Sequence, residues 1–218
     1  MESANTREAY TLQATLAARL GVRVNTLVTR CLPEVLEVWE GIARQHPIRD
    51  RRWVLVHLNA ATPEQLARIR RLGLVATTNP ISYLYRSASD EVARLGGAAD
   101  QLLPHRSLAR HRIPFGIATD NKPADPWVAF AAVVARRDMR TNIVVGPGER
   151  LTRAQALAAL TGGGAAVTFA ERERGRLAPG WAADLAVLEH DPLTAPLEDL
   201  VGQTARLTMV GGDIVHHV

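Results

Sequence analysis

The chain has very little cysteine, few aromatic residues and no long apolar run. Cys31 is the single cysteine, so neither a disulfide framework nor a cysteine-based metal cluster can form. No apolar run approaches the ~20 residues that cross a bilayer, and the polar start MESANTREAY lacks the layout of a secretory signal. These absences predict a protein with no membrane span, in a reducing, cytoplasmic setting.

Lysine is equally scarce, since Lys122 is the only one, and the net charge of +4 comes from arginine. The aromatic residues make up 5% of the chain and do not interleave with the arginines, which disfavours a platform for stacking nucleic-acid bases. Most arginines alternate with apolar residues at helical spacing. We therefore expect solvated helix faces and no nucleic-acid partner, with the arginines at positions 68, 70, 71, 106, 110, 112, 136 and 137.

Strand-like and helix-like segments alternate along the first 140 residues. Apolar, β-rich runs occupy 22–28, 52–59, 74–80 and 113–120, and amphipathic segments occupy 7–21, 33–46, 62–73, 105–112 and 125–138. Residues 81–103 indicate loop and broken helix. This alternation predicts an α/β fold with parallel strands, either a small doubly wound sheet or part of a (β/α)8 barrel, which when complete needs about 250 residues.

The pattern changes near residue 175. A helix over 151–168 runs into three glycines, and the remainder indicates β structure: a strand within 183–189 and two strands around Gly211 and Gly212. We therefore divide the chain into a βα region, 1–170, and a small β segment, 171–218.

The tail carries a series of residues that resembles the amidohydrolase superfamily, in particular its amidohydrolase-3 branch. The resemblance covers LTRAQAL, then GRLAPGWAADLAVLEHDPL and TMVGGDIV, and extends back through LVHLNAATPEQLARIRRLGLVATTNP and IPFGIATDNKPADPW. It implies a partial (β/α)8 TIM-type barrel, about strands 5–8, followed by a small β-sandwich-like segment. It also implies a hydrolase that cleaves non-peptide C–N bonds in a small-molecule amide by metal-activated water.

By this resemblance the sixth and eighth barrel strands supply a histidine and an aspartate, which map onto His57 and Asp120. Both residue types suit a divalent metal, with zinc the metal implied. Asp120 is expected to be both a metal ligand and the base that moves protons. We further assign substrate binding to Asn25, Asn59, Asn121 and Lys122, although a solvated loop is the simpler interpretation of Lys122.

Other reactive residue types are given structural interpretations. Cys31 has no evident base near it in sequence and is expected to be structural. His105 and His111 flank an arginine-rich segment, so we expect both to face solvent.

Several parts of the superfamily pattern have no counterpart here. No His-x-His pair occurs among the seven histidines, Asn25 stands where the fifth strand usually ends in histidine, and Val56 replaces a frequent glutamate. A catalytic zinc site usually needs three protein ligands. Either a separately encoded partner supplies the N-terminal half, or two copies associate and bury their open sheet edges, or the chain is a truncated remnant or partial gene with no activity of its own. The rival interpretation is a non-catalytic scaffold or subunit that keeps the half-barrel.

This incomplete ligand set predicts that the purified chain alone binds at most weak, substoichiometric zinc and has little or no amidase activity. Metal analysis of the isolated chain by mass spectrometry checks this. Tight zinc at one equivalent per chain would contradict the half-site interpretation.

Overall fold

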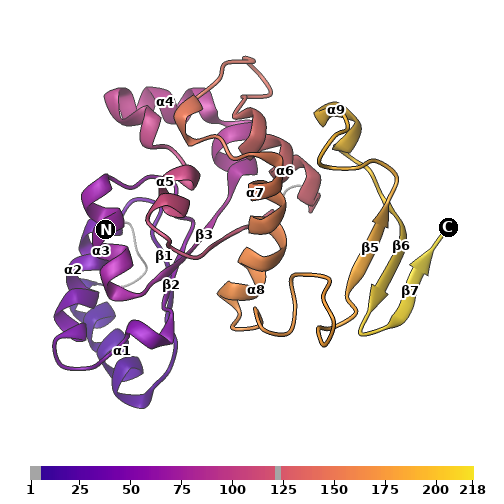
Figure 1. Cartoon of the computed structure of the whole chain (residues 1–218). Coiled ribbons are helices and arrows are strands. Elements are labelled where there is room, and N and C mark those ends of the chain that lie inside the picture. Colours follow the sequence, from indigo (N-terminus) through magenta and orange to yellow (C-terminus); the bar gives the residue numbers. More distant parts are fainter. Residues whose placement is uncertain (1–5, 121–123) are drawn as a thin grey trace.

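A computed structural model describes residues 6–120 and 124–218. Its centre is a parallel sheet in the order β1 (Asn25–Leu27), β2 (Val54–Val56), β3 (Val75–Thr78) and β4 (Phe115–Ile117). The predicted parallel α/β arrangement is confirmed, and all four strands lie within the segments expected to form them. The sheet is open and not a closed barrel within the described residues (Figure 1).

Helices connect the strands, as parallel pairing requires. Thr62 and Gln65 form a reciprocal capping box at the start of one of them, and Gly73 ends it with φ of 69°. No described helix is both long and apolar enough to cross a membrane. The helices of the βα region are α1 (Arg7–Leu20), α2 (Leu32–Ala43), α3 (Pro63–Leu72), α4 (Ala88–Leu95), α5 (His105–Arg110), α6 (Pro126–Ala135), α7 (Arg153–Ala158) and α8 (Gly164–Val167). Between β3 and α4 the chain forms a π-helical turn, Ile81–Arg86, and after α4 a 3-10 segment, Gly96–Gln101.

The main core lies between the sheet and the layer of α1, α2 and α3. Trp39 of α2 and Trp53, just before β2, are fully buried and meet edge to face with ring centroids 5.1 Å apart. Leu55 and Ala76 bring the buried side chains of β2 and β3 into the same cluster. This core fixes β2 and β3 side by side.

The β4 edge of the sheet is covered. The Pro114 carbonyl accepts from the Ala76 N–H of β3, so the Phe115 carbonyl points away from β3. Gly163, in the π-helical turn Ala159–Gly163, lies against that carbonyl so closely that a Cβ there would overlap it. The sequence led us to expect that both edges of the parallel sheet are open, and in the structure β1 is the edge of this sheet that remains open among the described residues.

The tail forms a separate antiparallel sheet of β5 (Leu185–Leu188), β6 (Ala205–Val210) and β7 (Asp213–His217). The predicted strand and Gly-Gly hairpin are confirmed, but the described residues form a single sheet and no sandwich. Helix α9 (Leu197–Leu200) contacts α6, and the Gly202 N–H donates to Asp125 Oδ2 at 2.9 Å. The tail is thereby attached to the βα region (Figure 1).

Two residues expected to face solvent are buried instead. Arg136 is fully buried and donates to the carbonyls of Leu102, Leu103 and Val145, and burial lowers its pKa to about 10. His105 is also fully buried, with Nε2 2.9 Å from Thr78 Oγ1, and burial followed by the charge of Arg136 lowers its pKa well below the ordinary value. The three carbonyls replace the lost hydration of Arg136, and the Thr78 hydroxyl does so for His105 Nε2, whereas His105 Nδ1 has no partner among the described residues. Helical spacing alone could not reveal this burial.

The close approach of Gly163 to β4 gives a paired prediction. Gly163→Ala forces the turn away from the Phe115 carbonyl and should lower the free energy of unfolding by about 1–3 kcal/mol, as overpacking does. Gly164→Ala is the control, because its Cβ meets nothing within 4 Å and alanine favours the helix by roughly 0.5–1 kcal/mol. Urea unfolding of both variants checks this, and equal effects would contradict the packing account.

Candidate functional site

His57 and Asp120 meet at the carboxyl edge of the parallel sheet. His57 directly follows β2, and Asp120 lies just beyond β4. Because β3 lies between these strands, the two side chains must reach across its end, and His57 Nε2 comes within 3.4 Å of Asp120 Oδ2. Their side chains are 22% and 36% exposed, so the pair is open to solvent and to a ligand.

Both residues adopt backbone conformations that non-glycine residues rarely use. His57 has φ of 57° and Asp120 has φ of 60°, in the left-handed region. Such conformations persist where the surrounding structure holds them and are concentrated at functional sites. Here they turn the chain sharply as it leaves each strand.

Asn79, at the end of the middle strand, holds the Asp120 carboxylate by a hydrogen bond. It follows β3 and is fully buried, and its Nδ2 donates to Asp120 Oδ2 at 2.9 Å. Its Oδ1 accepts from the Ser82 N–H at 3.1 Å. Because the oxygen is already engaged by a backbone donor, the amide can present only its N–H group to Asp120, and this fixes the orientation of the carboxylate.

Tyr83 is a site neighbour that the sequence analysis missed. It lies in the π-helical turn Ile81–Arg86, and its ring meets that of His57 edge to face with centroids 6.2 Å apart. Single π-helical turns are frequent at functional sites. No sequence signal marks this turn. For Asn79 the sequence does give a signal, because it ends a strand at the same edge as His57, where a loop residue could shape the pocket.

The structure does not bring all of the predicted substrate-binding residues to the His57–Asp120 pair. Asn59 is buried, and its Nδ2 has no hydrogen-bond partner among the described residues. Asn25 is paired in register with Val54 at the beginning of β1, so it lies at the opposite end of the strand from His57. It is not brought to the edge where the substrate-binding role was predicted. Asn121 and Lys122 lie outside the described residues.

The His57–Asp120 pair fits part of a zinc site. Two ligand atoms each about 2.0–2.1 Å from a tetrahedral zinc ion lie roughly 3.3–3.4 Å apart. The observed separation of 3.4 Å matches this and is long for an N–H···O hydrogen bond. No group of three or more His, Cys, Asp or Glu side chains that could hold a metal occurs within residues 6–120 and 124–218.

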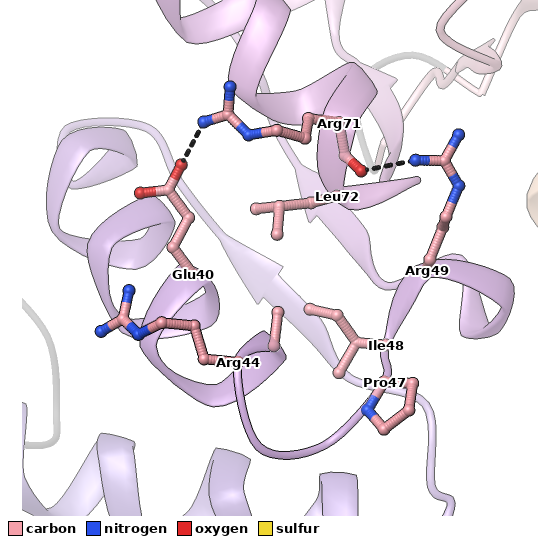
Figure 2. Close-up of a pocket in the computed structure, with 8 residues that line it drawn as sticks. Glu40, Arg44, Pro47, Ile48, Arg49, Arg71 and Leu72 are labelled. Carbon is pink, nitrogen blue, oxygen red and sulfur yellow. Dashed lines mark hydrogen bonds and ion pairs between the residues drawn. The ribbon is translucent and has the colours of Figure 1, made fainter.

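A pocket of about 510 Å³ lies elsewhere, between the C-terminal ends of α2 and α3 (Figure 2). Most of its charged groups have partners within the pocket: Arg71 pairs with Glu40 at 3.0 Å, and Arg49 donates to the Arg71 carbonyl at 2.8 Å. Arg49 precedes β2 and Leu72 precedes β3, so the pocket is at the amino end of the strands. Barrel enzymes place their chemistry at the carboxyl end, where His57 and Asp120 lie.

The model of the Amidohydrolase family matches residues 18–216, which include the parallel sheet, the His57–Asp120 pair and the antiparallel tail. The chain belongs to the amidohydrolase family. The resemblance seen in the sequence is confirmed.

Solved and curated relatives agree with this assignment. An uncharacterized metal-dependent hydrolase from Pyrococcus furiosus is 25% identical with a TM-score of 0.69, over 88% of this chain and 39% of that one. A zinc-bound adenosine deaminase from Xanthomonas campestris is 18% identical with a TM-score of 0.65, over 96% and 48%, and shows the fold alone. The Arabidopsis thaliana protein LONG AFTER FAR-RED 3 is 26% identical over 197 residues, 88% of this chain and 33% of that protein. This amidohydrolase-family chain thus spans less than half the length of each of these three relatives.

The fixed orientation of Asn79 predicts the effect of an isosteric change. Asn79→Asp keeps the acceptor for Ser82 but sets a second carboxylate against Asp120, so it should lower the free energy of unfolding by about 1–3 kcal/mol at pH 7. The loss should shrink as the pH falls from 7 towards about 4, because two carboxyls in contact hold a proton more tightly than a free one and the protonated carboxyl can donate.

The reciprocal swap N79D/D120N is the control. It restores an amide facing a carboxylate, so chemical unfolding should show most of the stability regained. A double variant no more stable than Asn79→Asp would contradict the proposed contact.

Proposed function

We propose that this amidohydrolase-family chain carries one half of the active site of a metal-dependent hydrolase that cleaves non-peptide C–N bonds in a small-molecule amide. The separation of His57 Nε2 and Asp120 Oδ2, 3.4 Å, is the observation that carries the proposal, because it suits two ligands of one zinc ion. The similarity to a metal-dependent hydrolase at 25% identity supports it.

The four residues that meet at this site each have a role in the proposed function. His57, as neutral imidazole, offers Nε2 to the metal, and its ring is braced by the edge of Tyr83. Asp120 offers a carboxylate oxygen that Asn79 holds in place, and the same carboxylate can accept the proton of an attacking water. A bound zinc ion supplies Lewis-acid activation of water and of the amide carbonyl.

The remaining ligands must come from outside the described residues. A separately encoded N-terminal half or an associated copy of the chain can supply them. We infer that residues 1–170 form the half-barrel and residues 171–218 the accompanying β segment. Contacts of Asn59, Asn121 and Lys122 with substrate remain predictions of this proposal.

The alternative function is a non-catalytic scaffold that keeps the half-barrel. Two observations favour it: the described residues offer no third ligand, and Asn25 lies at the far end of β1 from His57. A scaffold needs no contact between His57 and Asp120, whereas the hydrolase does. The two functions are therefore separated by whether these two side chains bind metal together.

The test is a zinc titration of the whole chain by calorimetry, with His57→Ala and Asp120→Asn. Asparagine is chosen because it tolerates the left-handed backbone at position 120. We expect weak binding by the wild type and none detectable in either variant. His216→Ala, which removes an exposed histidine of β7, is the matched control and should bind like the wild type.

Zinc binding that survives both His57→Ala and Asp120→Asn would refute the proposed site. Binding that is lost only in His216→Ala would assign it to the histidines at the end of the tail. Undetectable binding by the wild type would favour the scaffold.

A further inference from the structure

The sheet and the helical layer that covers it end on the same side of the molecule. β1 is the terminal strand of the parallel sheet. α1 packs on α2, and α2 packs on α3, so α1 is the terminal helix of that layer (Figure 1). The surface formed by α1 and β1 is therefore the place where further secondary structure could be added.

α1 presents an exposed leucine ridge on this surface. Leu12, Leu16 and Leu20 recur every four residues and are 72%, 51% and 69% exposed. Ala14 and Ala18 of the same helix are buried in the core of the chain, so the ridge is a second apolar face. A helix that is apolar on two faces is typical of one with neighbours on both sides.

Beside this ridge, no strand within residues 6–120 and 124–218 pairs with the outer side of β1. The Val24 carbonyl and the Val28 N–H pair with β2, so in a parallel ladder the backbone groups of Asn25 and Leu27 face outward. The Leu27 carbonyl accepts a weak bond from the Cys31 thiol at 3.4 Å. The Leu27 side chain is 61% exposed. An open strand edge flanked by exposed apolar side chains pairs readily with another chain.

We propose that a second copy of this chain covers the surface through a two-fold axis. In this dimer β1 pairs antiparallel with β1 of the second copy, with Asn25 opposite Leu27 and Thr26 on the axis. An axis perpendicular to the sheet also sets the two α1 helices side by side and antiparallel, with Leu12 of each copy against Leu16 of the other. One two-fold rotation thus pairs the open strands of the two sheets and packs the two terminal helices together.

In this arrangement the charges on α1 of one copy face opposite charges on α1 of the other copy. Glu8 and Arg19 are both exposed, and neither forms an ion pair with another described residue. Along the helix axis, Glu8 lies about 9 Å before the midpoint between Leu12 and Leu16, and Arg19 lies about 7.5 Å after it. Around the helix, both residues lie on the same side of the leucine ridge. Antiparallel packing therefore brings Glu8 of each copy to Arg19 of the other. This match singles out a second copy as the occupant.

The dimer goes beyond the proposed function and constrains it. A copy on β1 occupies the edge to which any further barrel strand would be added. In this antiparallel dimer the carboxyl ends of the two sheets point in opposite directions, so the second copy brings no ligand to the His57–Asp120 site. Of the two sources of ligands in the proposed function, only a separate polypeptide that displaces the second copy could then complete the barrel.

Sedimentation velocity of the whole chain, without metal, tests the dimer across a wide concentration range. We expect a reversible monomer–dimer equilibrium. Leu16→Glu, which puts a charge next to the axis, should weaken it at least tenfold, while circular dichroism shows an unchanged fold. Val215→Glu, which charges a 60% exposed apolar position on β7, is the control and should not weaken it.

A charge swap tests the antiparallel orientation. Glu8→Arg and Arg19→Glu should each weaken the dimer, and the double variant E8R/R19E should restore it. The two positions are about 16 Å apart along one helix, so restoration must come from contact between copies. A chain that stays monomeric at all concentrations, a dimer indifferent to Leu16→Glu, or a double variant weaker than both singles would overturn the proposal. His57→Ala should dimerise like the wild type, which separates this test from that of the metal site.

Discussion

The parallel register of β2, β3 and β4 is the constraint on which the rest of the site depends. Parallel strands end at the same edge, and here three consecutive strands end in His57, Asn79 and Asp120. The outer two side chains meet across the end of the middle strand, where the buried amide of Asn79 donates to the same Asp120 oxygen that His57 approaches. A change of register of one residue on any strand would turn its terminal side chain to the other face.

The packing around that edge is as important as the edge itself. Trp39 and Trp53 hold the helical layer on β2, and Gly163 lets a helical turn cover the outer edge of β4. One end of the sheet is thereby closed while β1 remains open. This asymmetry leaves β1 as the edge at which the parallel sheet can gain a neighbour.

Family membership and chemical competence are different properties of this chain. The family match covers the fold and the tail, yet the described residues bring together only one histidine and one aspartate as possible zinc ligands. Zinc in a catalytic site usually has three protein ligands, so these two side chains alone do not make up such a ligand set. The exposed leucines of α1 and β1 therefore matter for the site as well, because what binds at this edge decides whether further ligands can reach His57 and Asp120.

By itself the sequence determined the order and type of the elements, the parallel sheet, the hairpin of the tail and the pairing of His57 with Asp120. These follow from periodicity, capping residues and resemblance, which are local properties or properties of order. Only the tertiary structure decided that Asn79 donates to Asp120, that Tyr83 lies beside His57, that His105 and Arg136 are buried, and that Asn25 lies at the wrong end of β1. The reason is that burial and strand register depend on what packs from distant segments, and a solvated arginine and one that donates to three buried carbonyls have the same local sequence pattern.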